Sequence, residues 1–110
     1  MNTIGFDAFH QLDLRIGEVK SAQPVIGSRK LMALSVDLGD EYKVVTILAG
    51  TQGVFAEKDL VGKKFMFVAN LEPKEMAGET SNGMLLAADV DHKPYLLEMP
   101  QELANGTRVC

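Results

Sequence analysis

Apolar and polar residues alternate with a period of two in the first half of the chain, which predicts β-strands. Leu12, Leu14 and Ile16 alternate with polar residues, and residues 34–38 repeat the pattern. Residues 42–48 are rich in β-branched side chains, and the preceding Gly39-Asp40-Glu41 is typical of a hairpin turn. We therefore expect three strands here, the second and third joined as a hairpin.

The alternation slips in the first of these strands. Val19 is apolar where strict alternation places the apolar residue at position 18, which predicts a β-bulge at Gly17-Glu18. A bulged and bent first strand is what a small closed barrel needs in order to turn its corner.

The rest of the chain supplies further short elements. Residues 6–11 predict a short helix with Phe6, Phe9 and His10 as inward-facing candidates, and residues 56–60 predict one helical turn ending near Gly62. Residues 64–71 predict a fourth strand, central in the sheet because residues 65–69 are apolar on both faces. A loop over 72–83 then leads to a fifth strand at 84–88.

Five short strands with a small helix between the third and fourth match a mainly β protein, a five-stranded OB-fold barrel. No repeat or linker interrupts residues 1–110, so we expect one domain. The strand-like segments 95–99 and 107–109 exceed what five strands need. We therefore expect residues 90–110 to form a C-terminal extension that lies in an assembly interface.

Composition excludes several classes of site. The 110 residues suit one compact core. The only cysteine is Cys110, so neither a disulfide nor a thiolate metal cluster is expected, and the two histidines lie 82 positions apart. We expect no metal and no cofactor. The N-terminus has no basic region or long apolar stretch and no run approaches a membrane span, which favours a soluble, cytoplasmic protein.

The net charge of −4 is unevenly distributed. Residues 1–14 carry two acids and no base, residues 15–74 carry nine bases and seven acids, and residues 75–110 carry two bases and six acids. The centre is therefore mildly basic between acidic ends. Phosphate binding rewards a positive field, so the net charge taken whole argues mildly against nucleic-acid binding, but the distribution matters more than the sum.

No catalytic constellation is present. His10 and His92 lie in contexts typical of surface or half-buried histidines. Gly50 and Gly53 lack the Lys-Ser/Thr of a phosphate-binding loop, and the paired acids Asp40-Glu41 are explained by turn chemistry. We predict a non-enzyme with no catalytic residues and no small-molecule substrate.

Two segments point to binding. In residues 27–32, Arg29 and Lys30 open a strand, and in residues 70–84, Asn70 ends the most apolar strand and a long polar segment leads to Met84. Each has a structural alternative. Asn70 is equally well explained as a loop anchor, and Met84 is more readily explained by core packing. Lys74 is more often a solvated cation than a phosphate ligand.

These segments resemble the tRNA-binding domain family, whose members include the OB domain appended to many methionyl-tRNA synthetases and free-standing dimeric tRNA-binding proteins. The resemblance covers residues 6–89 and lies in Leu-Asp-Leu-Arg-Ile-Gly-Glu-Val at 12–19, Gly-Ser-Arg-Lys-Leu at 27–31, Asn-Leu-Glu-Pro-Lys at 70–74 and Ser-Asn-Gly-Met-Leu-Leu-Ala-Ala at 81–88.

The resemblance implies a non-catalytic protein that holds tRNA by its folded shape, either free-standing or assisting an aminoacyl-tRNA synthetase. Shape-selective RNA binding uses cations and polar donors at fixed spacing. It also implies a homodimer, with residues 90–110 in the interface. The RNA-binding residues so implied are Arg15, Arg29, Lys30, Asn70, Lys74, Ser81 and Met84, of which the cations contact phosphates and Met84 makes a soft apolar contact.

One departure from the family concerns charge. The loop after Asn70 is usually richer in Lys and Arg, whereas here Glu72, Glu75 and Glu79 accompany the single cation Lys74. A carboxylate near a phosphate path weakens binding and flattens its salt dependence.

Two other functions compete with tRNA binding. The acidic loop and six methionines suit an OB-fold dimer that interacts with proteins, as a chaperone or scaffold, without strong RNA binding. Single-strand binding by stacking is the weaker alternative, because the chain has no Trp and only Tyr42 and Tyr95 are candidate exposed aromatics.

Overall fold

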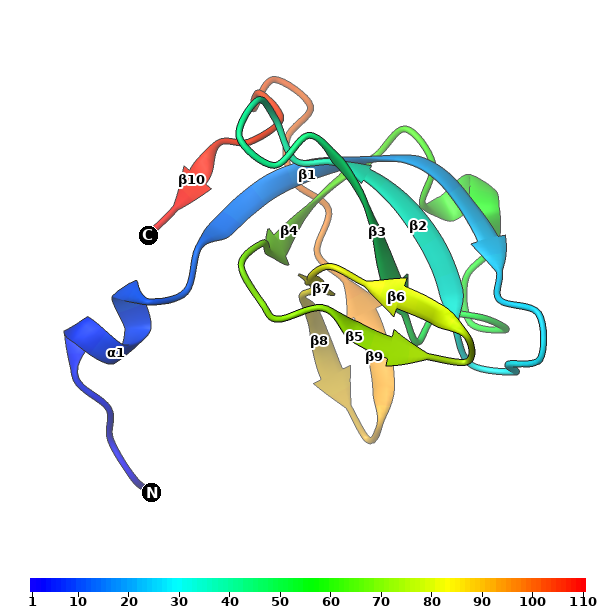
Figure 1. Ribbon diagram of the computed structural model, residues 1–110, viewed down its shortest axis with the longest axis horizontal. Helices are drawn as coiled ribbons and strands as arrows, with labels where there is room; N and C mark the ends of the chain where they lie inside the picture. Colours follow the sequence, from blue (N-terminus) through cyan, green and yellow to red (C-terminus); the bar gives the residue numbers. More distant parts are fainter.

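The computed structural model describes all residues 1–110 and confirms a mostly β protein whose strands form a nearly closed five-stranded barrel (Figure 1). The elements in chain order are α1 (Phe6–His10), β1 (Leu14–Pro24), β2 (Met32–Asp37), β3 (Val44–Ala49), the 3-10 turn η1 (Glu57–Asp59), β4 (Lys64–Val68), β5 (Lys74–Met76), β6 (Glu79–Ser81), β7 (Met84–Leu85), β8 (Ala87–Val90), β9 (Lys93–Leu96) and β10 (Arg108–Val109).

The barrel is built from antiparallel neighbours in the order β3-β2-β1-β4-β7. β1 is the longest strand and pairs with β2 through its second half and with β4 through its first half. β3 and β7, at the two ends of this order, lie next to each other, and the amide of Asn82 donates to the carbonyl of Thr46 at 2.8 Å. This contact brings the two edges together, which is how a small sheet becomes a barrel.

The core lies inside this barrel. Its fully buried large side chains include Phe65 and Phe67 of β4, Leu34 of β2 and Ile47 of β3. Leu60 after η1 packs into the same cluster, so the helical turn covers one opening of the barrel. The central position predicted for the fourth strand is confirmed, because β4 pairs with β1 on one side and β7 on the other.

The predicted bulge lies elsewhere. The register of β1 with β2 shifts between Val19 and Ser21, not at Gly17-Glu18. Glycine occupies position 17 for a reason other than a bulge. A Cβ at this position would lie 2.7 Å from Val36 Cγ1 and 2.8 Å from Leu38 Cδ2. The absence of a side chain at Gly17 therefore lets Val36 of β2 and Leu38, just after this strand, pack closely against β1 inside the barrel.

The segment 72–83, predicted as a loop, contains the β5–β6 hairpin. Its turn residues Ala77 and Gly78 have φ values of 51° and 81°, as a two-residue turn with two left-handed positions requires. The prediction failed because the flanking strands are short and carry charged residues instead of an apolar alternation. The hairpin lies over β3 and forms one wall of the groove described below.

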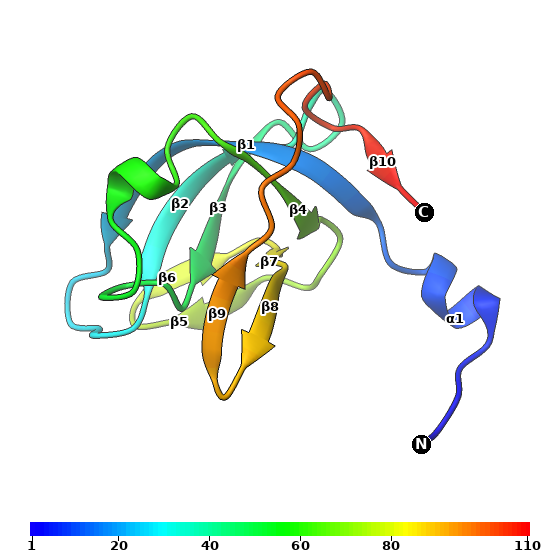
Figure 2. The ribbon, with the colours of Figure 1, turned by 180° about the vertical axis from the view of Figure 1, so that it is seen from behind.

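The fifth predicted strand is interrupted, and the tail adds to the fold. β7 ends at Leu85, and β8 leaves the barrel to pair with β9 as a separate hairpin. β10 pairs with the beginning of β1, and Lys64 Nζ donates to the carbonyls of Gln101 and Leu103 at 3.0 and 2.6 Å. The residues after β9 are thus fastened to the barrel at several points, and Figure 2 shows them running from β9 to β10.

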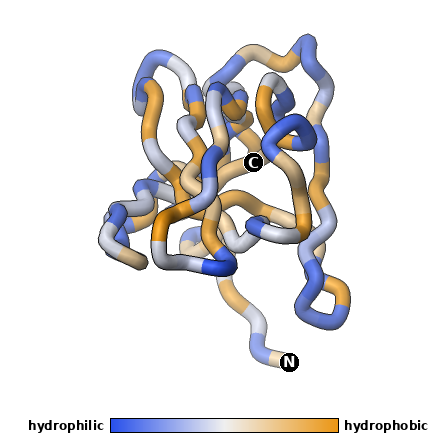
Figure 3. Tube along the Cα trace, turned by 90° about the vertical axis from the view of Figure 1, so that its right-hand side faces the viewer, coloured by the Kyte–Doolittle hydropathy of each residue, from blue (hydrophilic) through white to orange (hydrophobic).

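The N-terminal helix forms as predicted, but Phe6 and His10 do not face inward and Phe9 is only partly buried. None of its residues is buried, and Phe6 is 84% exposed. Figures 1 and 3 show the segment before β1 projecting from the body. No helix has the length and apolar character required to cross a bilayer.

Candidate nucleic-acid interface

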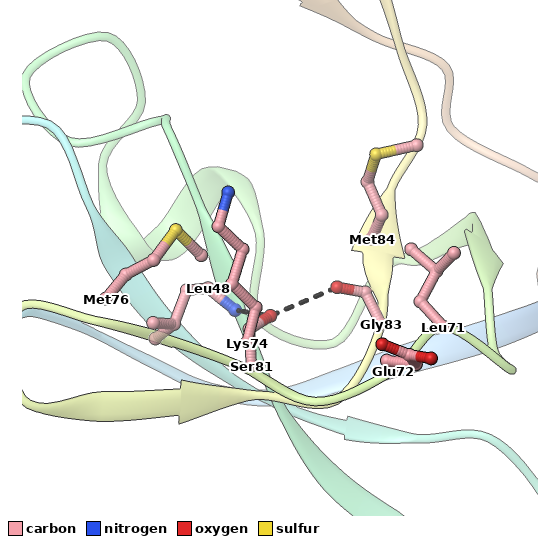
Figure 4. Close-up of a pocket in the computed structure, with 8 residues that line it drawn as sticks. All are labelled: Leu48, Leu71, Glu72, Lys74, Met76, Ser81, Gly83 and Met84. Carbon is pink, nitrogen blue, oxygen red and sulfur yellow. Dashed lines mark hydrogen bonds between the residues drawn. The ribbon is translucent and has the colours of Figure 1, made fainter.

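A groove of about 530 Å³ lies between the β5–β6 hairpin and the start of β7 (Figure 4). Lys74 and Met76 point in from the hairpin, while Leu71, Glu72 and Met84 line the opposite side. The lining residues are Leu48, Leu71, Glu72, Lys74, Met76, Ser81, Gly83 and Met84. A pocket of this size with apolar walls and few polar groups is typical of a ligand site.

Ser81 forms part of the floor of the groove and ties its two sides together. Its side chain is buried, and its Oγ accepts a bond from the Leu48 amide at 2.9 Å while it donates to the Gly83 carbonyl at 3.0 Å. The hydroxyl proton is used in the second bond, so Ser81 fixes the position of Gly83 below Met84. The Ser81 hydroxyl therefore has no free proton to donate to RNA, and its predicted contact with RNA stays a prediction.

The β5–β6 hairpin presents different residues on its two faces. Lys74 pairs with Ser81 across the strands and Met76 with Glu79, so these four share one face of the hairpin, and all of them except Glu79 line the groove. Glu75 pairs with Thr80 and belongs to the other face, and neither lines the groove. The ammonium group of Lys74 has no hydrogen bond or ion pair within the chain, so it is free to bind an anion.

Met84 is 46% exposed, which contradicts its assignment to the core. The cause is the position of β7 at the edge of the barrel, where it pairs only with β4 over two residues. The thioether is flexible and polarisable and packs well against flat rings. Met84 therefore offers the soft apolar contact that the resemblance implies.

Arg29 and Lys30 lie in the turn between β1 and β2, next to the hairpin. Leu31 and Met76 pack against the same small cluster of Val25, Ala33 and Leu48. Figures 1 and 2 both show the 25–31 turn beside the tip of the β5–β6 hairpin. Both cations are exposed and have no side-chain partner in the chain. Arg29, Lys30 and Lys74 are named the open cationic surface below.

Arg15 lies at the opposite end of β1, in the interior. It is 7% exposed and its guanidinium donates to Asp13 at 2.7 Å, to Glu41 at 3.1 Å and to the carbonyl of Gly106 at 3.0 Å. The Tyr42 ring lies under it at 5.5 Å. We name Asp13, Arg15, Glu41 and Tyr42 the β1 ion-pair cluster. All contacts of Arg15 are internal, so its predicted phosphate contact stays a prediction and its visible role is structural.

Electrostatics reinforce this cluster. The bond from Arg15, supported by one from Tyr42, holds the pKa of Asp13 below its ordinary value although burial opposes the shift. The bond to Asp13 raises the pKa of Arg15, and the same carboxylate raises the pKa of Tyr42, whose hydroxyl donates to it at 2.6 Å. Each charged partner therefore stabilises the charge of the other.

Asn70 acts as a loop anchor, which was the structural alternative to its predicted contact with RNA. Its Oδ1 accepts from the Asp13 amide at 2.8 Å and its Nδ2 donates to the Gln11 carbonyl at 2.7 Å. The side chain thus fixes the segment before β1 to the end of β4. Asn70 is exposed and therefore accessible to a ligand, and its contact with RNA stays a prediction.

Of the seven predicted residues, the structure gathers Lys74, Ser81 and Met84 in the groove and puts Arg29 and Lys30 beside it. Arg15 and Asn70 lie elsewhere. The prediction missed the apolar lining residues Leu48, Leu71 and Met76. Only Met76 left a signal, since it stands two residues from Lys74 and shares its face once the segment is known to be a strand.

Comparison with known proteins places this fold in a family. The family model described as "Putative tRNA binding domain" matches residues 14–108. A methionine–tRNA ligase of Clostridium tetani is 43% identical over 108 residues, which cover 96% of this chain and 16% of the ligase. The chain thus spans about a sixth of the length of the curated relatives it matches.

Two solved structures cover nearly the whole chain. A MetRS-related protein from Pyrococcus horikoshii has a TM-score of 0.93 and 38% identity, with 100% of each chain covered. The chaperone CsaA from Bacillus anthracis has a TM-score of 0.87 and 30% identity, with 99% of this chain and 100% of the other covered. The likeness extends through residues 90–110, which the resemblance in the sequence did not reach. This chain belongs to the tRNA-binding domain family.

Proposed function

We propose that the chain binds folded tRNA by its shape without catalysing a reaction, either alone or beside an aminoacyl-tRNA synthetase. The observation that carries the proposal is the open cationic surface. Three cations without partners in the chain border an apolar groove, although the chain as a whole carries a net charge of −4. Free cations of this kind lower the cost of approaching phosphates, and a concentrated patch can bind RNA despite the overall charge.

The family supports the same proposal. The matched model is described as a putative tRNA binding domain, and the relatives include methionine–tRNA ligases and a MetRS-related protein. A-form RNA exposes phosphates and 2′-hydroxyls at regular spacing, so recognition by shape needs cations held at fixed positions. In this chain, the hydrogen bonds of Ser81 and the packing of Leu31 and Met76 provide that rigidity.

The test is fluorescence anisotropy of labelled, folded tRNA at three salt concentrations with Lys30→Gln and its control Lys43→Gln. Lys43 is also exposed but lies in the β2–β3 turn, at the other end of β2. We expect Lys30→Gln to weaken binding roughly two- to fivefold at low salt and to reduce the salt slope by about one. Lys43→Gln should match the unchanged protein. Equal effects of both variants, or no binding at low salt, would contradict the proposal.

We also propose that the chain forms a homodimer through residues 90–110. The outer face of the β8–β9 hairpin supports this: Val90, Tyr95 and Leu97 are 52%, 47% and 45% exposed. A second copy of a weak site raises the overall affinity through effective concentration. Tyr95→Asp should give a monomer in sedimentation with an unchanged fold, because Tyr95 lies outside the core. A dimer that survives this change and Leu97→Asp would contradict the assignment.

A protein-binding function is the second candidate. The groove carries two flexible methionines and two leucines, a lining that adapts to apolar side chains, and one structural relative is named a chaperone. Binding of an unfolded peptide that is insensitive to Lys30→Gln and to salt would favour it over the tRNA proposal.

A further inference from the structure

The groove contains a carboxylate that phosphate binding does not explain. Glu72 lines it across from Lys74, and both side chains are exposed. They form no ion pair with each other or with any other residue. A carboxylate beside a phosphate path repels it, so an unpaired acid in a site for RNA needs either another explanation or another ligand.

We propose that this groove takes one unstacked guanine base of the bound RNA, with Glu72 as the residue that selects it. This inference rests on the proposed function and names its ligand more closely. An ionised carboxylate accepts hydrogen bonds through two oxygens and donates none. Guanine presents two adjacent donors, its ring imino and exocyclic amino groups, on the Watson–Crick edge. Its O6 and N7 acceptors, on the neighbouring edge, are the atoms that Lys binds.

The charge pattern of the groove distinguishes guanine from the other bases. Adenine and cytosine place an acceptor next to their amino group, and uracil places its single imino donor between two acceptors. Each would set a lone pair against a Glu72 oxygen, which an acceptor-only group disfavours. A negative group on one side and a positive group on the other therefore match the donor edge and the acceptor edge of guanine.

The walls of the groove suit a flat ring. Met76 and Met84 stand on opposite sides, and Leu48 adds apolar surface next to Met76 (Figure 4). Thioether sulfurs make favourable contacts with aromatic rings, and single-stranded or looped RNA offers bases that have left the stack. The groove volume of about 530 Å³ exceeds that of a cavity of about 150 Å³ known to accept benzene.

The hairpin supplies a matched control. Glu75 carries the same charge three residues from Glu72, but it lies on the face of β5 away from the groove and is exposed. If the acids act only by long-range repulsion, Glu72→Gln and Glu75→Gln should both tighten RNA binding. If Glu72 binds guanine, the two variants should change the affinity in opposite directions. The sign of the effect thus separates the two explanations.

The experiment measures binding of folded tRNA to the full chain and to both variants, with thermal melting to check the fold. We expect Glu72→Gln to weaken binding roughly tenfold, because a glutamine places an amide donor against one guanine donor. Glu75→Gln should bind equally or slightly more tightly. Tighter binding by Glu72→Gln, or no change, would overturn the base site and leave the proposed function standing.

A second measurement separates failure of the base site from failure of tRNA binding. Guanosine and inosine monophosphates differ only in the 2-amino group, and their binding can be followed by amide chemical shifts of Lys74, Gly83 and Met84. We expect the guanosine nucleotide to shift these amides at lower concentration, and Glu72→Gln to remove the difference. If the groove prefers the guanosine nucleotide but the chain does not bind tRNA, the proposed function is refuted and the guanine site stands. An equal response to both nucleotides, or a response to neither, would overturn the guanine site.

Discussion

Arg15 and Arg29 have the same side chain at opposite ends of β1, and their surroundings make them different residues. Arg15 is buried in the β1 ion-pair cluster, where every bond it donates ends within the chain. Arg29 is exposed in the 25–31 turn and has no partner in the chain. A cation with satisfied bonds holds the fold, whereas a cation without partners can hold a ligand. The difference teaches that the partners of an arginine, more than its presence in a motif, decide its function.

The largest effect expected from this comparison is that of Arg15→Ala. Removing the guanidinium leaves Asp13 half-buried without its main partner, and breaking such a pair costs about 3 kcal/mol. The free energy of unfolding in urea measures this loss. A variant of unchanged stability with greatly weakened tRNA binding would reverse the comparison and make Arg15 an RNA ligand.

A smaller loss is expected for Tyr42→Phe. The substitution removes one hydroxyl that donates to the Asp13 carboxylate at 2.6 Å, and bonds to charged groups contribute about 2 kcal/mol. The phenylalanine ring keeps its place under Arg15, so the effect isolates the hydrogen bond. Urea unfolding gives the magnitude. Stability within error of the unchanged protein would show that water replaces the hydroxyl at no cost.

Acid should weaken the same cluster progressively. The pKa of Asp13 is lower in the folded chain than its ordinary value of 3.8. The ionised carboxylate therefore contributes its full stabilisation when the pH is above this ordinary value. That contribution is lost as the pH falls below this value and through the lowered folded pKa. Unfolding measured between neutral and strongly acidic pH should show the loss, and Asp13→Asn should show a shallower acid dependence. The same acid dependence in both proteins would exclude Asp13 as its source.

The smallest effect on stability is expected for Arg29→Gln. An exposed residue without partners changes the free energy of unfolding by less than about 0.5 kcal/mol. Its effect should instead appear in RNA binding, as a salt slope reduced by about one. Together with Arg15→Ala, this variant separates the two regions: one loses stability, and the other loses affinity. A stability loss at Arg29 comparable to that at Arg15 would abolish the distinction.

The barrel could be predicted because its strands depend on local alternation and on turn residues. The strands at 34–38 and 42–48, the hairpin turn between them and the central strand from Lys64 all follow from this pattern, and the structure confirms them. The β5–β6 hairpin could not be predicted in the same way. Its strands have three residues each, and its register depends on the left-handed turn at Ala77-Gly78.

The candidate site was predicted only in part, for a related reason. A sequence shows which residues carry charge but does not show which charges already have partners. Asp13 lies two positions from Arg15 and is its visible candidate partner, whereas Glu41 and Tyr42 join the cluster only through the hairpin between β2 and β3. The opposite faces of Lys74 and Glu75 depend likewise on the pairing of β5 with β6. Such distinctions follow from tertiary structure alone.

Both ends of the chain leave the barrel near the start of β1, because α1 precedes this strand and β10 pairs with its first two residues. The open cationic surface lies toward the far end of the same strand, which spans about 30 Å over its eleven residues. A polypeptide joined at either end would therefore emerge away from the groove (Figure 1). The domain can therefore be joined through a linker at either end to a much larger protein, and the attachment leaves its binding surface open.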